Sequence, residues 1–191
     1  VTFHQTGMDL WNVPAGLSMQ SAFSLTRLPN TVQFKSNWFN SPSSCFEMFG
    51  NIYDDNIYFN ATFHSGIVIP FGCDISYMFM RLRIFNQTLP NLSTTAGRIS
   101  YVAVLAYCSA YAQPLPASWI APTTVQNIVS YYFLFNDCVL FDQDLGSTFV
   151  GSAANNMTNM FSGATSYTNG GSNSIESWDT SNVNDFTNAL L

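Results

Sequence analysis

The stretch Phe85-Asn86-Gln87-Thr88-Leu89 decides the fold, because its pattern recurs along the chain at an almost constant interval. An aromatic residue is followed by a short polar segment and then by an apolar residue. The copies open with Phe34, Phe59, Phe85, Tyr111, Phe141 and Tyr167. Their spacings are 25, 26, 26, 30 and 26 residues. An interval this even predicts a repeat protein.

Each copy carries two more apolar landmarks. One lies six positions before the aromatic residue. Another apolar residue precedes it by three or four positions, and this spacing is typical of one face of a short helix. The other landmark follows the second apolar position of the copy by three or four residues. Together the landmarks predict this repeat core: Phe59, Phe79, Phe85, Leu89, Leu105, Tyr111, Leu115, Trp119, Phe135, Phe141, Leu145, Phe161, Tyr167, Ile175 and Trp178.

Three anchors per repeat predict an α/β solenoid with leucine-rich-repeat-like coils of about 26 residues, each a short strand plus a short helix or turn. One coil cannot bury its anchors alone, whereas stacked coils bury them against their neighbours. The pattern is regular over residues 71–191, and we interpret residues 1–70 as divergent N-terminal coils or a cap. A β-sandwich or jelly roll with evenly spaced strands is the alternative.

Composition excludes several function classes. Charged residues make up only 8 % of the chain, and the five Lys and Arg leave a formal net charge of −6. A nucleic-acid partner would require a basic stripe, so we expect none. No run reaches the length of about 18 apolar residues that a membrane span needs. The chain begins at Val1 without a signal-peptide pattern, and we interpret it as a processed segment.

Four cysteines and four glycosylation sequons are the candidate modification sites. Cys108 and Cys138 occupy the same position of their copies, three residues before the aromatic residue. Two interpretations remain for this position: buried free thiols, or a disulfide between adjacent coils. Cys45 and Cys73 lie at other positions, and no spacing indicates zinc. The sequons place candidate N-glycans on Asn60, Asn86, Asn91 and Asn156.

Asn60 and Asn86 occupy one column, which has a second interpretation. Together with Asp142 and the neighbouring glutamines, they predict a ladder of side chains along the stacked coils. The side chains of this ladder would form hydrogen bonds with backbone groups of the turns. The glutamines are Gln87, Gln113 and Gln143.

Catalytic and metal-binding patterns are weak. His4 and His64 are the only histidines, and neither accompanies a nucleophile motif. Asp54-Asp55 and the pair Asp142 and Asp144 fit no calcium-loop spacing, so we interpret them as solvated turn acids. We therefore expect no enzyme, no cofactor and no metal.

The C-terminal third resembles a known family. Phe141-Asp142-Gln143-Asp144-Leu145 is similar to the phrase FNQDL, residues 156–167 to NMTNMFSGATSF, and residues 174–183 to SISSWDTSNV. These phrases are typical of BspA-like leucine-rich-repeat proteins, which occur in bacterial surface proteins, parasitic protists and large viruses. The resemblance is close over 141–191, fair over 75–145 and weak before 71. It implies surface display, adhesion or protein–protein contact and brings no catalytic residues.

The hypothesis is therefore a non-enzymatic repeat protein at an extracellular, cell-surface or virion location. It would serve as the structural subunit of an assembly or particle through self-association or other protein contacts, as low charge and the lack of a capping sequence at Leu191 suggest. The alternatives are an adhesin-type module that binds a host protein or glycan, and a sandwich or jelly-roll capsid-type protein.

Overall fold

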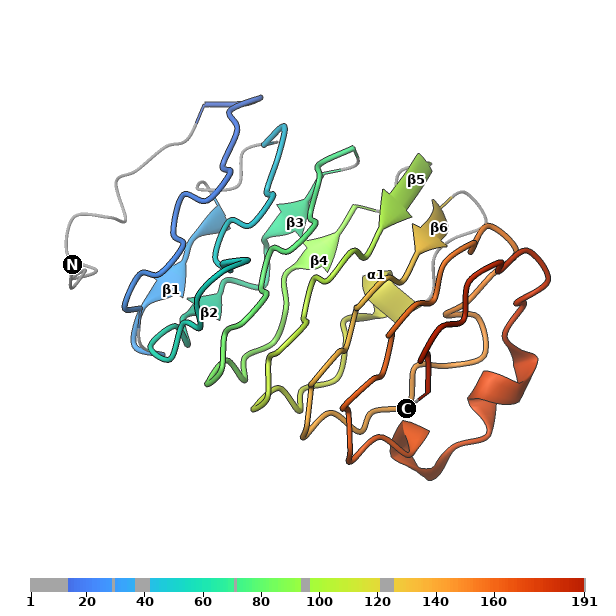
Figure 1. Ribbon diagram of the computed structural model, residues 1–191. Helices are drawn as coiled ribbons and strands as arrows, with labels where there is room; N and C mark the ends of the chain where they lie inside the picture. The colour runs from blue at the N-terminus through green and yellow to red at the C-terminus, as the bar shows by residue number, and fades with distance from the viewer. Residues whose placement is uncertain are drawn as a thin grey trace.

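The computed structural model describes residues 14–28, 30–36, 42–70, 72–93, 97–120 and 126–190. Within them the chain runs through successive coils that lie side by side from one end of the molecule to the other (Figure 1). His4, one of the two histidines, lies outside the described residues.

Regular secondary structure is short. The strands are β1 (Gln33–Phe34), β2 (Thr62–Phe63), β3 (Val68–Ile69), β4 (Asn91–Leu92), β5 (Gly97–Ser100) and β6 (Gln126–Ser130). The helices are α1 (Ala117–Ile120) and the 3₁₀ turns η3 (Asn169–Gly171) and η4 (Ser174–Ser177). The pairs β1–β2, β3–β4 and β5–β6 are all parallel. Sandwiches and jelly rolls are built from antiparallel strands, so the pairing among the described residues contradicts that alternative.

A row of parallel bridges joins coil to coil. It links Ser18 to Ser44 and Ser44 to Asp74, and further along Ser130 to Asn156 and Asn156 to Asp185. Backbone hydrogen bonds extend each bridge along the coil: the amides of Tyr131, Phe133, Phe135 and Asp137 donate to the carbonyls of Asn156, Thr158, Met160 and Ser162. We call this face of the molecule the ladder face. The ladder satisfies backbone groups that turns would otherwise leave unpaired.

The structure has turns in the segment of each coil for which the sequence allowed either a short helix or a turn. Between Ile75 and Phe79 the chain makes turns, and Tyr77 has a left-handed φ of 59°. The equivalent residue of each coil is left-handed too: Ser21, Glu47, Ala103, Phe133, Asn159 and Asn188. A residue in the left-handed region interrupts a right-handed helix, so these segments are turns. The apolar residues on either side still point inward.

The inward aromatic rings form stacks that run along the molecule. Ring centroids of Phe85 and Tyr111 lie 5.9 Å apart, those of Tyr111 and Phe141 6.0 Å, and those of Phe141 and Tyr167 5.9 Å. The first twelve residues of the predicted repeat core, from Phe59 to Phe161, are buried. Tyr167, Ile175 and Trp178 are half-buried.

Buried tryptophan and tyrosine groups find backbone partners. The indole nitrogen of Trp119 donates to Pro90 O at 2.8 Å, and the hydroxyl of Tyr101 donates to Trp119 O at 3.2 Å. The equivalent hydroxyl of Tyr131 donates to Phe149 O. These bonds fix the rings that form the third column of the core, because a buried polar group is costly when unpaired.

Candidate functional site

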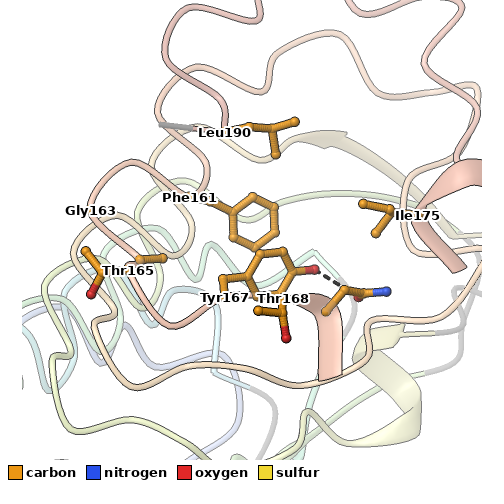
Figure 2. A pocket seen from close by; sticks show the side chains of 9 residues that line it. Phe161, Gly163, Thr165, Tyr167, Thr168, Ile175 and Leu190 are labelled. Carbon is orange, nitrogen blue, oxygen red and sulfur yellow. Dashed lines mark hydrogen bonds between the residues drawn. The ribbon is translucent and has the colours of Figure 1, made fainter. Parts of the chain in front are cut away.

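An apolar groove lies beside the last described coil, and we call it the C-terminal groove. It has a volume of about 290 Å³. Figure 2 shows the ring of Tyr167 below that of Phe161, with Leu190 above the two rings and Ile175 to their right. The groove is lined by Phe161, Gly163, Ala164, Thr165, Tyr167, Thr168, Asn169, Ile175 and Leu190. It offers apolar contact and a few hydroxyls, and none of its lining residues is an acid or a base.

The tyrosine of the groove is held in place by Asn169. The Tyr167 hydroxyl donates to Asn169 Oδ1 at 3.0 Å, and this oxygen also accepts the amide of Leu145 at 3.2 Å. Burial, with Asp144 and Asp142 nearby, raises the pKa of Tyr167 above its usual value. The hydroxyl therefore stays protonated at neutral pH and acts as a donor.

The predicted polar ladder is present. Asn60 Oδ1 accepts the amide of Asn86 at 3.1 Å and the side-chain amide of Gln87 at 3.1 Å. One coil on, Asn86 Oδ1 accepts the amide of Ala112 at 3.0 Å and that of the Gln113 side chain at 3.1 Å. Each asparagine thus satisfies the turn of the next coil, which is a structural role.

Asp142 continues this ladder as a carboxylate. Its Oδ1 accepts the amides of Thr168 at 2.6 Å and Gly170 at 2.9 Å. These bonds hold the pKa of Asp142 below its usual value, and a bond from the Ser174 hydroxyl does the same for Asp144. The carboxylate oxygens of Asp142 and Asp144 already accept hydrogen bonds from protein donors. A calcium ion would have to replace these donors, because it binds carboxylate oxygens directly.

The other acidic candidate, Asp55, forms an ion pair. Its carboxylate lies 3.0 Å from Arg83 and 3.2 Å from Arg81. Although partial burial opposes ionisation, the hydrogen bonds from Arg83 and Arg81 lower the pKa of Asp55. Among the residues that the structure describes, no three His, Cys, Asp or Glu side chains gather as a metal site would require.

The sequons differ in exposure. Asn91 is exposed at the edge of β4, whereas Asn60, Asn86 and Asn156 are half-buried. Asn156 is a bridge residue whose Oδ1 accepts the amide of Thr158 at 2.9 Å. Since an N-glycan requires an accessible asparagine, Asn91 is the sequon best placed for one.

Cys108 and Cys138, the candidate disulfide pair, are both buried free thiols in the structure, as are Cys45 and Cys73, and their pairing stays a prediction. Each thiol of the candidate pair donates to a carbonyl of an earlier coil, Cys108 to Phe79 O at 2.9 Å and Cys138 to Leu105 O at 3.0 Å. Burial raises the pKa of Cys108 to about 12, so this thiol is unreactive at neutral pH.

His64 lies on a shallow cavity without a catalytic constellation. The cavity has a volume of about 280 Å³, and Phe63, Ser65, Thr88, Leu89, Pro90, Asn91 and Pro116 also line it. His64 Nδ1 accepts the amide of Gly66 at 3.0 Å. None of these residues supplies the carboxylate that would orient a histidine base.

One edge of the molecule carries an exposed apolar row that the sequence argument missed. Its members stand one or two positions before the aromatic residues Phe59, Phe85 and Phe141, and they are Ile57, Tyr58, Ile84, Val139 and Leu140. The copy of Tyr111, between the last two, has Ser109 and Ala110 at these positions. Their exposed fractions range from 38 % to 53 %. The repeat period alone does not reveal the row, because it does not show which positions of a copy face solvent.

A second apolar surface lies over the ladder face. A small cluster of Met80, Ala103 and Ala106 is covered by half-buried aromatic rings, among them Tyr77, Tyr107 and Phe133. The guanidinium of Arg81 lies 4.4 Å from the centre of the Tyr107 ring. We call this surface the aromatic patch.

Comparison with known proteins places most of these features in one family. Residues 74–190 match the family described as "Mycoplasma protein of unknown function, DUF285". The match covers more than half of the chain. The chain belongs to the DUF285 family. No curated protein and no solved structure matches it.

The DUF285 region holds the C-terminal groove and the regular part of the polar ladder. The first coils, with Cys45 and Asn60, lie before it. In the described part of this DUF285 chain, no helix has the length and apolar character needed to cross a membrane.

Proposed function

We propose that this DUF285 chain is a non-enzymatic repeat protein that is exposed at a cell or particle surface and builds an assembly through protein–protein contacts. The proposal includes the fold class: the stacked coils form one leucine-rich-repeat-like solenoid. It also includes the finer family, because the phrases at 141–183 resemble BspA-like surface proteins and DUF285 is associated with that group.

The apolar row is the observation that supports protein contact best. Ile84 and Leu140 are exposed although they stand beside buried aromatic residues. Exposed apolar side chains that recur at equivalent positions of a repeat protein offer a surface for contact with a partner. With only 8 % charged residues, the chain has few charged side chains to desolvate when its surface is covered by a partner.

The experiment is light scattering of the purified chain over a range of concentrations, followed by electron microscopy. We expect species larger than the 21.2 kDa monomer. The double variant Ile84→Ser, Leu140→Ser should be monomeric, because it removes apolar contact area without touching the core. Tyr53→Ser is the matched control, since Tyr53 is 81 % exposed and lies outside the row.

A monodisperse 21 kDa species at every concentration would contradict self-assembly. Equal assembly of the double variant and the wild type would show that the apolar row is not the contact.

The aromatic patch favours a second function, an adhesin-type module that binds a host glycan or protein. Sugar rings pack on aromatic side chains, and the half-buried Tyr77 and Tyr107 are the aromatic residues of this patch. A glycan screen tests this alternative: Tyr107→Ala should lose the signal, and the absence of any wild-type signal would count against it.

A further inference from the structure

Two cysteines from neighbouring coils meet at the inner side of the ladder face. Ser44 and Asp74 form a parallel bridge, and the amide of Cys45 donates to Asp74 O at 2.8 Å. Cys45 follows one bridge residue and Cys73 precedes the other. Because side chains alternate along an extended chain, both point to the side opposite the bridge residues, into the core.

The two sulfur atoms are closer than unbonded sulfurs normally approach. Their separation is 3.1 Å, and the exposed fractions of Cys45 and Cys73 are 0 % and 5 %. A bond would bring them to about 2.05 Å, a shift that small side-chain rotations supply. This is the feature that separates them from Cys108 and Cys138, whose thiols donate to carbonyls.

Cys73 also has a path to solvent. A shallow cavity of about 310 Å³ lies against it, lined by Gly72, Asp74, Ile75, Ser76, Ser100 and Val102. The hydrogen bond with Cys45 lowers the pKa of Cys73, whereas that contact and burial raise the pKa of Cys45. One proton shared by two sulfurs makes the first ionisation easier and the second harder.

We propose that Cys45 and Cys73 form a disulfide that joins the first coils to the regular array. The oxidant is a small disulfide such as oxidised glutathione. The Cys73 thiolate attacks one of its sulfurs and releases the first glutathione thiolate. Cys45, as a thiolate, then attacks the Cys73 sulfur of the mixed disulfide and releases the second. Two protein thiols become one disulfide, and oxidised glutathione becomes two molecules of glutathione.

A Cys45–Cys73 disulfide bears on the compartment in which the protein functions. It links a coil before the DUF285 match to the coil at which that match begins. Such a bond persists in an oxidising compartment, outside the cell or in a secretory lumen. This inference does not depend on the apolar row or on assembly.

The experiment starts with the reduced wild-type chain treated with oxidised glutathione. The product is denatured, alkylated and digested, and its peptides are mapped by mass spectrometry without reduction. We expect two alkylated cysteines, Cys108 and Cys138, and one linked peptide pair that contains Cys45 and Cys73. The oxidised chain should melt roughly 5–10 °C above the reduced chain, because the crosslink restricts the unfolded state.

Variants locate the bond. Cys108→Ser should still form the bridge, whereas Cys73→Ser should leave Cys45 free to alkylation in the denatured chain. Four alkylated cysteines after oxidation of the wild type would overturn the proposal. A bridge between Cys108 and Cys138, or glutathione retained on Cys73, would overturn it equally.

Discussion

At the scale of single residues, the fold depends on backbone conformations that most side chains avoid. Glu47, Tyr77 and Phe133 all have φ between 52° and 59°. Each such residue costs about 1–2 kcal/mol relative to a right-handed conformation. The amides of these residues donate to carbonyls of the next coil, at 2.9 Å for Glu47, Tyr77 and Phe133 alike. The ladder therefore offsets the cost of the turns.

This column of left-handed residues could not be predicted from the sequence. Glycine and asparagine signal positive φ, but Tyr77 and Phe133 do not. The inward positions were predictable because an aromatic residue every 26 residues is visible in any reading of the chain. The 26-residue period shows which residues are buried, whereas the turn geometry follows from hydrogen bonds between residues 25 to 29 positions apart, such as Tyr77 to Val102 and Glu47 to Ser76.

The close approach of coils at Gly50 leads to the first prediction. A Cβ atom at this position would lie 2.6 Å from Met80 N and 2.8 Å from Met80 O, both backbone atoms of the next coil. Backbone cannot rotate away as a side chain can, so Gly50→Ala should destabilise the fold by about 2–3 kcal/mol. Urea unfolding measures this change.

Gly151→Ala is the matched control, because nothing lies within 4 Å of its Cβ position. It should change the free energy of unfolding by less than about 0.5 kcal/mol. Equal stability of the two variants would contradict the close packing of the coils at Gly50.

At the scale of the coil, the aromatic stack repeats one ring per coil, and of its two tyrosines Tyr167 has a partner for its hydroxyl whereas Tyr111 has none among the described residues. Phe85, Tyr111 and Phe141 are fully buried and stack in sequence. No described residue offers a hydrogen-bond partner to the Tyr111 hydroxyl. Burial raises the pKa of Tyr111 well above its usual value, which shows how strongly this site disfavours charge.

The second prediction is that Tyr111→Phe stabilises the fold. The substitution keeps the ring and its stacking but removes a buried unpaired hydroxyl, so we expect a gain of about 1 kcal/mol in the free energy of unfolding. Tyr101→Phe is the control, because it removes a hydroxyl that donates to Trp119 O and should destabilise instead. A loss of stability in Tyr111→Phe would show that its hydroxyl has a partner.

At the scale of the coil, some features of the candidate sites could be predicted from the sequence and others could not. The ladder of Asn60 and Asn86 was predictable because identical residue types recur in one column. The contact between Cys45 and Cys73 was not, because the two residues occupy different columns and meet only through the diagonal register of Ser44 and Asp74. The apolar row likewise required knowing which side of each copy faces solvent.

At the scale of the whole molecule, acidic groups with lowered pKa values are concentrated toward the C-terminal end. Asp142, Asp144, Asp179 and Asp185 each accept hydrogen bonds that lower their pKa values. Asp142 and Asp144 face donors of the coil that follows, at Thr168 and Ser174. In a stack where each coil contacts its neighbours, loss of such bonds loosens the local coils first.

The third prediction is that acid loosens the C-terminal coils before the first coils. A carboxylate whose pKa is lower in the folded state contributes stability above its unfolded value of about 4, and this contribution is lost as pH falls through the folded pKa. Between about pH 5 and pH 2, amide hydrogen exchange corrected for intrinsic rates should therefore accelerate around 168–174 before it does around 75–82. Asp142→Asn should weaken this pH dependence, because the amide oxygen accepts the Thr168 and Gly170 amides without titrating. Uniform acceleration along the whole chain, or an unchanged profile in Asp142→Asn, would show that these carboxylates do not set the order in which the coils open.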